Sequence, residues 1–139
     1  MPSEVKFEEQ KAQQAPISLE LACSALNELW SPRVVGQVNN QYIKVVKVQG
    51  EFPWHSHEDE DEMFLVLRGV LRIGRAEADG GPVSVHPGEF FVVRRGVRHN
   101  TSATEETWIA LIETTTTLHT GSEQTALTRS IADQLGSAS

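Results

Sequence analysis

Three histidines and one glutamate are the residues of this sequence whose types and spacing could support metal chemistry. His55 and His57 are separated by one residue, and Glu62 closes an acidic run that begins at Glu58. His99 occurs much later, directly after a predicted turn. Imidazole nitrogens together with a carboxylate oxygen form a donor set that binds divalent transition metals. The four residues are therefore candidate ligands, provided that the fold brings them together.

The elements predicted around these residues would place them on one surface. Alternate residues of a strand project from the same face, so a strand that ends at His57 would present the imidazoles of His55 and His57 side by side. Glu62 begins the next predicted strand, and a hairpin between the two strands would carry its carboxylate over the imidazoles. His99 stands at the start of a later strand. The pattern favours a converging site inside a barrel.

A less specific interpretation has to be weighed beside the metal site. A single His-x-His pair is weak evidence, and the acidic residues 58–61 are typical of a solvated turn. Glu62 differs because it directly precedes the apolar run 63–67, where a buried carboxylate is costly unless a charged group meets it. We expect His86 and His119 to lie on the surface.

The composition indicates one acidic globular domain. The chain has 139 residues, of which 39% are hydrophobic and 22% charged, as is typical of a single domain. The net charge of −7 argues against nucleic acid and anionic membrane surfaces, because both attract clustered Lys and Arg. The single cysteine, Cys23, cannot form an internal disulfide. With no signal-peptide pattern and no membrane-spanning run, we expect a cytoplasmic protein.

The middle of the chain predicts an all-β fold. Short runs rich in β-branched and aromatic residues alternate with turn residues, which is typical of a sandwich or a small barrel. The expected strands are residues 33–38, 42–48, 51–57, 62–67, 71–77, 83–85, 89–93, 99–101 and 107–114.

One short helix is predicted ahead of these strands. Apolar residues follow helical spacing from Leu19 to Leu29, and Ser18 can cap the N-terminus, so we expect the helix over residues 18–30. The expected parts of the chain are an N-terminal arm (1–16), a single domain (17–119) and a C-terminal tail (120–139).

The spacing of the candidate ligands resembles the two signature motifs of the cupins. The first motif, G-x(5)-H-x-H-x(3,4)-E-x(6)-G, is matched by Gly50, His55, His57, Glu62 and Gly69. The second, G-x(5)-P-x-G-x(2)-H-x(3)-N, is matched by Gly88, Gly96 and His99. The first loop is one residue short, Arg94 stands in place of the proline, and Ala103 stands in place of the asparagine. These departures leave the ligand positions intact.

The resemblance implies a cupin jelly-roll β-barrel with a short N-terminal helix and a divalent transition metal. The ion would be Fe, Mn, Ni or Cu, with Zn possible. Glu62 is also the candidate catalytic base. The implied metal ligands are His55, His57, Glu62 and His99. Strand alternation from Glu62 places Phe64 and Val66 on the inward side, and either Phe91 or Phe90 would face in from a later strand. The expected lining of the substrate pocket is therefore Phe64, Val66 and Phe91.

This site predicts a metal-dependent enzyme for a small organic substrate, namely an oxygenase. Four protein ligands leave open positions on a metal that prefers six, where a substrate could chelate through its oxygen atoms. Two alternatives stay open, because fold alone does not decide function. One is a non-catalytic module that binds or senses a small molecule, and the other is a cupin isomerase or lyase.

Trp54 indicates a further surface that must be covered. It alternates with His55 and His57, so it is expected to face away from the cavity. Either the N-terminal arm of the same chain or a second copy would cover it. We expect a homodimer that shares the arm and a sheet edge, which would also hide an edge strand.

Overall fold

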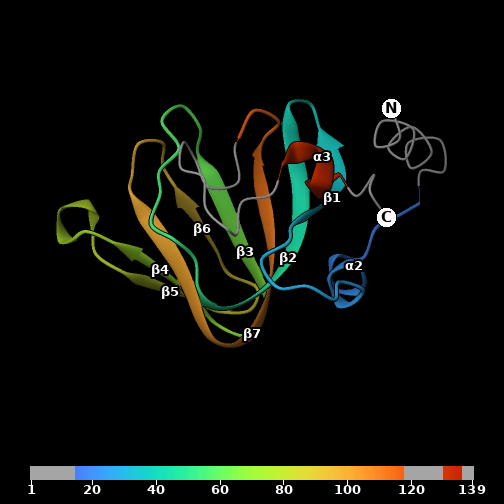
Figure 1. The fold of residues 1–139 in the computed structure, drawn as a ribbon, viewed down its shortest axis with the longest axis horizontal. Helices are drawn as coiled ribbons and strands as arrows, with labels where there is room; N and C mark the ends of the chain where they lie inside the picture. The colour runs from blue at the N-terminus through green and yellow to red at the C-terminus, as the bar shows by residue number, and fades with distance from the viewer. Residues whose placement is uncertain (1–14, 118–129, 136–139) are drawn as a thin grey trace.

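The computed structural model describes residues 15–117 and 130–135, in which strands predominate (Figure 1). His119 lies outside this part, as does nearly all of the expected arm 1–16 and much of the tail 120–139. The strands are β1 (Arg33–Val38), β2 (Gln41–Glu51), β3 (Glu62–Arg68), β4 (Leu71–Arg75), β5 (Val83–Val85), β6 (Phe90–Val93) and β7 (His99–Thr114). The helical elements are α2 (Leu19–Ser24), η1 (Glu77–Asp79) and α3 (Ile131–Gln134).

Strand β7 organises the molecule because it is paired along both edges. On one edge β2 runs antiparallel to it, from Gln41 opposite Thr114 to Glu51 opposite Ser102. On the other edge the first part of β7 pairs with β4 and the second part with β3. The sheet order is β1-β2-β7-β3-β6, with β4 and β5 branching from β7. The antiparallel jelly-roll fold expected from the sequence is confirmed.

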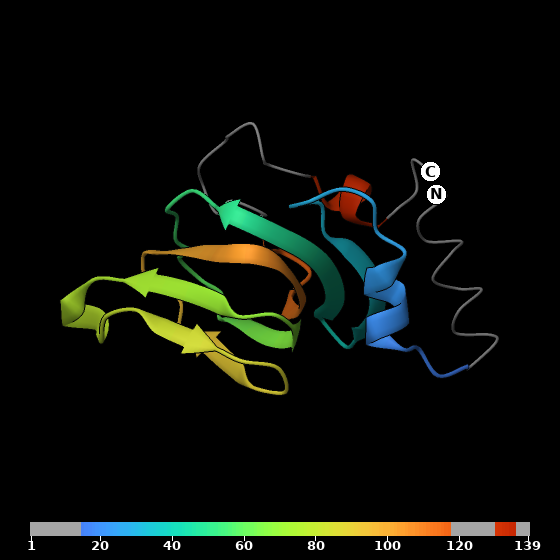
Figure 2. The ribbon, with the colours of Figure 1, turned by 90° about the horizontal axis from the view of Figure 1, so that it is seen from below.

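Alternation along β2 divides the apolar residues between two packed layers. Val46 and Val48 point to the inner face, where they are buried with Phe64 of β3. Val45 points the other way and packs against Cys23 of α2. Figure 2 shows α2 alongside β1 and β2, far from the turn that joins β4 to β5. The inner face is therefore the one that encloses the core of the barrel.

Helix α2 is shorter than the expected range 18–30. Ser18 caps it, as predicted, by accepting a hydrogen bond from the helix backbone. The helix ends at Ser24, and the chain then turns so that Trp30 can enter the core. Trp30 has a φ of +58°, a left-handed conformation that no α-helix contains, and its indole Nε1 donates to the carbonyl of Gln49 at 2.9 Å.

The strand pattern differs from expectation at two places. Residues 52–61 do not continue as a strand, because Pro53 has no amide proton for a ladder, and only His55 forms an isolated bridge, with His99. Consequently β3 does not form the expected hairpin with this segment, and pairs with β6 and β7 instead. The two runs expected at 99–101 and 107–114 are one continuous strand, β7, because β2 supports most of its length.

Within residues 15–117 and 130–135, no helix has the length and apolar character needed to cross a membrane.

Candidate metal centre

Four buried side chains from three segments of the chain converge inside the barrel. Their possible ligand atoms all lie within 4.8 Å of one another. Each residue is at most 6% exposed. The structure thus brings together the residues that the sequence singled out: His55, His57, Glu62 and His99.

Backbone carbonyl groups orient two of the imidazole rings. Nδ1 of His55 donates to the carbonyl oxygen of Pro53 at 2.8 Å, and Nδ1 of His99 donates to that of Val97 at 2.9 Å. Because a carbonyl oxygen only accepts, each Nδ1 must carry the proton, which leaves a lone pair on Nε2. This arrangement is typical of histidines that bind metals.

The loops that carry the ligands are tied to each other. The backbone amide of Gly96, whose φ is +79°, donates to the carbonyl oxygen of His57 at 2.8 Å. Asp61 accepts from the backbone amide of Arg95 at 2.9 Å and pairs with the guanidinium of Arg94 at 3.4 Å. Arg94, at the position of the motif proline, therefore helps to join the acidic turn to the loop before His99.

Polar atoms at the centre of the cluster lack partners. Oε1 of Glu62 lies 3.3 Å from Nε2 of His57 and 3.6 Å from Nε2 of His99. None of these three buried atoms has a hydrogen-bond partner among the described residues. Buried polar atoms are normally paired, because leaving them unpaired costs free energy. A divalent cation would satisfy this set of nitrogen and oxygen donors, so the residues present fit a metal.

Burial and neighbouring charges favour the metal-binding forms of His55 and Glu62, but not that of His57. Burial, followed by the proximity of His99, lowers the pKa of His55 from 6.5 to about 4. Burial alone would lower the pKa of His57, but the Glu62 carboxylate outweighs it and raises that pKa. Burial likewise favours neutral Glu62, yet the neighbouring Glu113 carboxyl group and the nearby imidazoles hold its pKa well below the usual value. Neutral imidazole and ionised carboxylate are the forms that bind metals.

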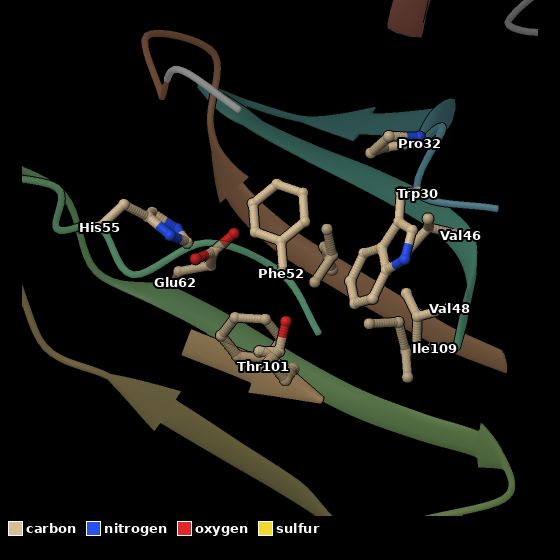
Figure 3. Close-up of a pocket in the computed structure, with 11 residues that line it drawn as sticks. Trp30, Pro32, Val46, Val48, Phe52, His55, Glu62, Thr101 and Ile109 are labelled. Carbon is tan, nitrogen blue, oxygen red and sulfur yellow. The ribbon is translucent and has the colours of Figure 1, made fainter. Parts of the chain in front are cut away.

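An apolar cavity of about 30 Å³ adjoins the cluster. In Figure 3, His55 and Glu62 lie at one end, Trp30 and Val48 at the other, and Phe52 between them. A cavity of this volume holds roughly two water-sized molecules. Pockets for organic ligands are larger, roughly 300–1,000 Å³. Its wall consists of Trp30, Pro32, Val46, Val48, Phe52, His55, Glu62, Phe64, Thr101, Ile109 and Leu111.

The three residues expected to line a pocket occupy different places. Phe64 lies in the wall of this cavity. Val66 is fully buried in the same core, two positions further along β3, and Phe91 packs half-buried against that core. The guanidinium of Arg75 lies 4.9 Å from the centre of the Phe91 ring. Neither Val66 nor Phe91 is among the described residues that line the cavity.

Two charged residues beside the site were missed at the level of sequence. Lys44 is fully buried, and its Nζ lies 2.5 Å from Oε1 of Glu113 and also contacts Oε1 of Gln134. Strand alternation contained the signal, because Lys44 shares a face with Val46 and Glu113 shares one with Leu111. A search for charged residues on otherwise apolar strand faces would have identified both Lys44 and Glu113.

The other histidine and the acidic turn behave as expected in the described part of the chain. His86 is exposed, and its Nδ1 lies 3.4 Å from the carboxylate of Glu89. Glu58 and Asp59 are exposed, as a solvated turn requires.

Known proteins share this architecture at several degrees of likeness. The hydroquinone 1,2-dioxygenase from Sphingomonas sp. TTNP3, solved with 4-hydroxybenzoate bound, superposes with a TM-score of 0.57 over 70% of this chain and 72% of its own. At 11% identity, this likeness shows the fold alone. YdbB, an uncharacterized protein of Bacillus subtilis strain 168, is 28% identical over 67 residues, or 48% of this chain. The match spans only 58% of the length of that relative.

A stronger likeness covers most of the chain. The crystal structure of a cupin-2 domain containing protein from Shewanella frigidimarina NCIMB 400 is 39% identical, with a TM-score of 0.69. That comparison covers 73% of this chain and 97% of the other. The family model of the cupin domain (Cupin_2) matches residues 42–123, which is more than half of the chain. With the motif residues gathered at one buried site, the protein belongs to the cupin-domain family.

Proposed function

We propose that this cupin is a metal-dependent oxygenase for a small organic substrate. The observation that carries the proposal is the group of buried ligand atoms within 4.8 Å of one another, three of which have no hydrogen-bond partner among the described residues. The proposed metal ligands are His55, His57, Glu62 and His99.

The donor set indicates which ions suit the site. Three imidazoles and one carboxylate, with no thiolate, fit Fe, Mn, Ni or Cu, while Zn is possible but more often occupies closed four-ligand sites. When bound, such an ion supplies Lewis acidity and, if redox-active, the capacity to activate dioxygen.

The residues of the chain have distinct tasks in this proposal. The carbonyl groups of Pro53 and Val97 keep the imidazoles of His55 and His99 in the form that presents Nε2 to the cation. A carboxylate with a pKa well below normal accepts protons weakly. That low pKa favours Glu62 as a ligand over Glu62 as the catalytic base.

The adjoining cavity favours oxygen chemistry. Its apolar wall and its volume of about 30 Å³ suit a small apolar molecule such as dioxygen. An organic substrate does not fit there, so its binding requires the residues around the imidazoles to move. The small cavity also favours a second candidate, a non-catalytic module that binds or senses a small molecule. A cupin isomerase or lyase, which needs no dioxygen, would gain nothing from this cavity.

Metal analysis followed by oxygen uptake separates these candidates. Purified protein is analysed for bound elements and then loaded in turn with Fe(II), Mn(II), Ni(II) and Cu(II). Each form is assayed for oxygen uptake with a panel of small hydroxy-carbonyl compounds, with His57→Ala as the matched control.

Each outcome of this experiment has a defined meaning. Uptake that needs both metal and His57 supports the oxygenase. Binding of a panel compound without turnover, retained after the metal is removed, favours the non-catalytic module. Turnover without oxygen uptake identifies an isomerase or lyase. Failure of the parent protein to bind any of the four ions refutes the metal site itself.

We also propose that two copies of the chain associate. Trp54 is 42% exposed and Val38, at the end of β1, is 56% exposed. Strand β1 is a terminal strand of the described sheet, so its outer edge can pair with another chain. Light scattering at micromolar protein should give the mass of a dimer, and a monomeric mass would contradict the proposal.

A further inference from the structure

Three ionisable side chains form a row across the inner face of the sheet. Glu62 of β3 and Glu113 of β7 are directly opposite each other in the strand register. Lys44 of β2 is opposite Leu111, two residues from Glu113, so it reaches Glu113 on the diagonal. Opposite and diagonal neighbours on one face of a sheet lie close enough for long side chains to meet.

This row is buried and internally connected. Lys44, Glu113 and Glu62 are 0%, 3% and 6% exposed. Nζ of Lys44 lies 2.5 Å from Oε1 of Glu113, and the carboxyl group of Glu113 lies beside that of Glu62 across the β3–β7 ladder. Oε2 of Glu113 has no hydrogen-bond partner among the described residues. The row therefore leads directly from the Lys44 ammonium to the proposed metal ligand.

Stability alone is a poor explanation for such a row. Removing charges from water is costly, and well-packed apolar residues at the same positions are often at least as stable. Strand neighbours of Lys44 and Glu113 on this face, such as Val46 and Leu111, are apolar and buried. The row is thus a departure from the apolar pattern at the positions that adjoin Glu62.

The contact of the row with Glu62 suggests what it does. Oε1 of Glu62 faces Nε2 of His57 and of His99, while Glu113 occupies the opposite position on the neighbouring strand, buried on the same face. A glutamate side chain is flexible, and a partner that holds it reduces the freedom lost when it binds a cation. Residues that hydrogen-bond to metal ligands commonly orient them in this way.

We infer that Glu113, held in place by Lys44, is a positioning residue that orients Glu62 toward the metal. This inference rests on the proposed function, because it takes Glu62 to be a ligand. It is a separate claim, since the site could bind metal without any help from Glu113.

The test compares metal affinity with the folding of the metal-free protein. Titration calorimetry with Ni²⁺ alone gives the affinity, and Cu²⁺ electron paramagnetic resonance reports the ligand arrangement. Glu113→Ala should weaken Ni²⁺ binding about 10–100-fold, the effect typical of losing a residue that supports a metal ligand. It should also alter the Cu²⁺ spectrum. Glu113→Gln, which keeps a hydrogen-bonding group of the same size, should restore most of the affinity.

A second variant covers the case in which Glu113→Ala leaves Lys44 unpaired and does not fold. The double variant Lys44→Met/Glu113→Leu replaces the buried pair with apolar residues of similar size, an exchange that folded proteins often tolerate. Its circular dichroism and melting should resemble those of the parent, with the same loss of Ni²⁺ affinity. Val45→Ala, buried on the opposite face of β2 against Cys23, is the packing control and should lower the melting temperature while leaving Ni²⁺ affinity unchanged.

The outcomes separate this inference from the proposed function. A parent protein that binds neither Ni²⁺ nor Cu²⁺ contradicts the metal site itself. A parent that binds Ni²⁺, with a folded double variant of equal affinity and an unchanged Cu²⁺ spectrum, overturns only the positioning role of Glu113.

Discussion

The inner face of the β2-β7-β3 sheet has a polar end and an apolar end, built from the same three strands. Strand β2 contributes Lys44 to the polar end and Val48 to the apolar end. Strand β3 contributes Glu62 and then Phe64. Both ends are buried to a similar degree, yet the first holds the unpartnered ligand atoms, and the second supplies the apolar wall of the cavity that adjoins them.

The comparison teaches that burial alone does not mark a functional site. At the apolar end, burial removes hydrocarbon from water and stabilises the fold. At the polar end, burial opposes folding unless a bound cation satisfies the lone pairs of the buried nitrogen and oxygen atoms. Substitutions at the two ends should therefore separate metal affinity from stability, and this separation can be measured.

The largest effect is expected for His99→Ala at the polar end. The substitution removes a proposed ligand directly. Loss of a residue that only supports a ligand typically weakens metal binding about 10–100-fold, so the affinity of His99→Ala for Ni²⁺ should fall further than that. The metal-free variant should keep a normal circular dichroism spectrum and lose the melting shift that metal produces by mass action. His86→Ala, an exposed histidine, is the control. Unchanged metal content in His99→Ala would show that His99 is no ligand.

Phe64→Ala at the apolar end should have the opposite profile. Phe64 is 4% exposed, and truncating a buried phenylalanine costs about 3–5 kcal/mol of unfolding free energy. Urea denaturation of the metal-free protein should detect this loss, whereas Ni²⁺ affinity of the folded variant should remain close to that of the parent. A large loss of affinity without a loss of stability would reverse the assignment of the two ends.

The pH dependence of stability provides a third comparison. The folded-state pKa of His55 is about 4, below the ordinary 6.5, so the unfolded chain binds a proton that the folded metal-free protein does not. The resulting contribution of His55 to the free energy of unfolding is fully present above pH 6.5 and is lost as the pH falls from about 6.5 to about 4. It amounts to about 3 kcal/mol at most.

The raised pKa of His57 acts in the opposite direction, so the comparison is made against His55→Gln. Urea denaturation between pH 4 and 7 should show a smaller loss of stability on acidification in His55→Gln than in the parent. Parallel curves for the two proteins would contradict the lowered pKa of His55. The cost of Phe64→Ala should not change with pH over the same range.

The smallest effect is expected for Val48→Ile, which adds one methylene to the wall of the cavity. If the extra group fills empty space, it stabilises the protein by up to about 0.8 kcal/mol. A rise in melting temperature of a few degrees would record this gain, and Ni²⁺ affinity should not change. A marked loss of stability would indicate that the cavity cannot accept the added group.

Sequence patterns predicted the fold and the grouping of the four candidate ligands, but not the way in which they meet. Motif spacing and strand alternation were sufficient to single out His55 and His57. The position of Pro53 could have warned that their segment would not form a regular strand, and the expected hairpin with Glu62 was wrong for that reason. The strand partners of Glu62 are instead Val93 and Glu113, which are distant in sequence, and pairing between distant strands leaves no local signal.

The double pairing of β7 has a consequence for the order of events during synthesis. His99 opens this strand and Glu113 lies near its end, while its neighbours β2, β3 and β4 are all made earlier. A ribosome-bound chain that stops before β7 has the first two histidines and Glu62 but lacks the strand that β2 and β3 flank. The proposed ligand set can therefore assemble only after β7 has emerged, so metal loading should follow translation of this strand.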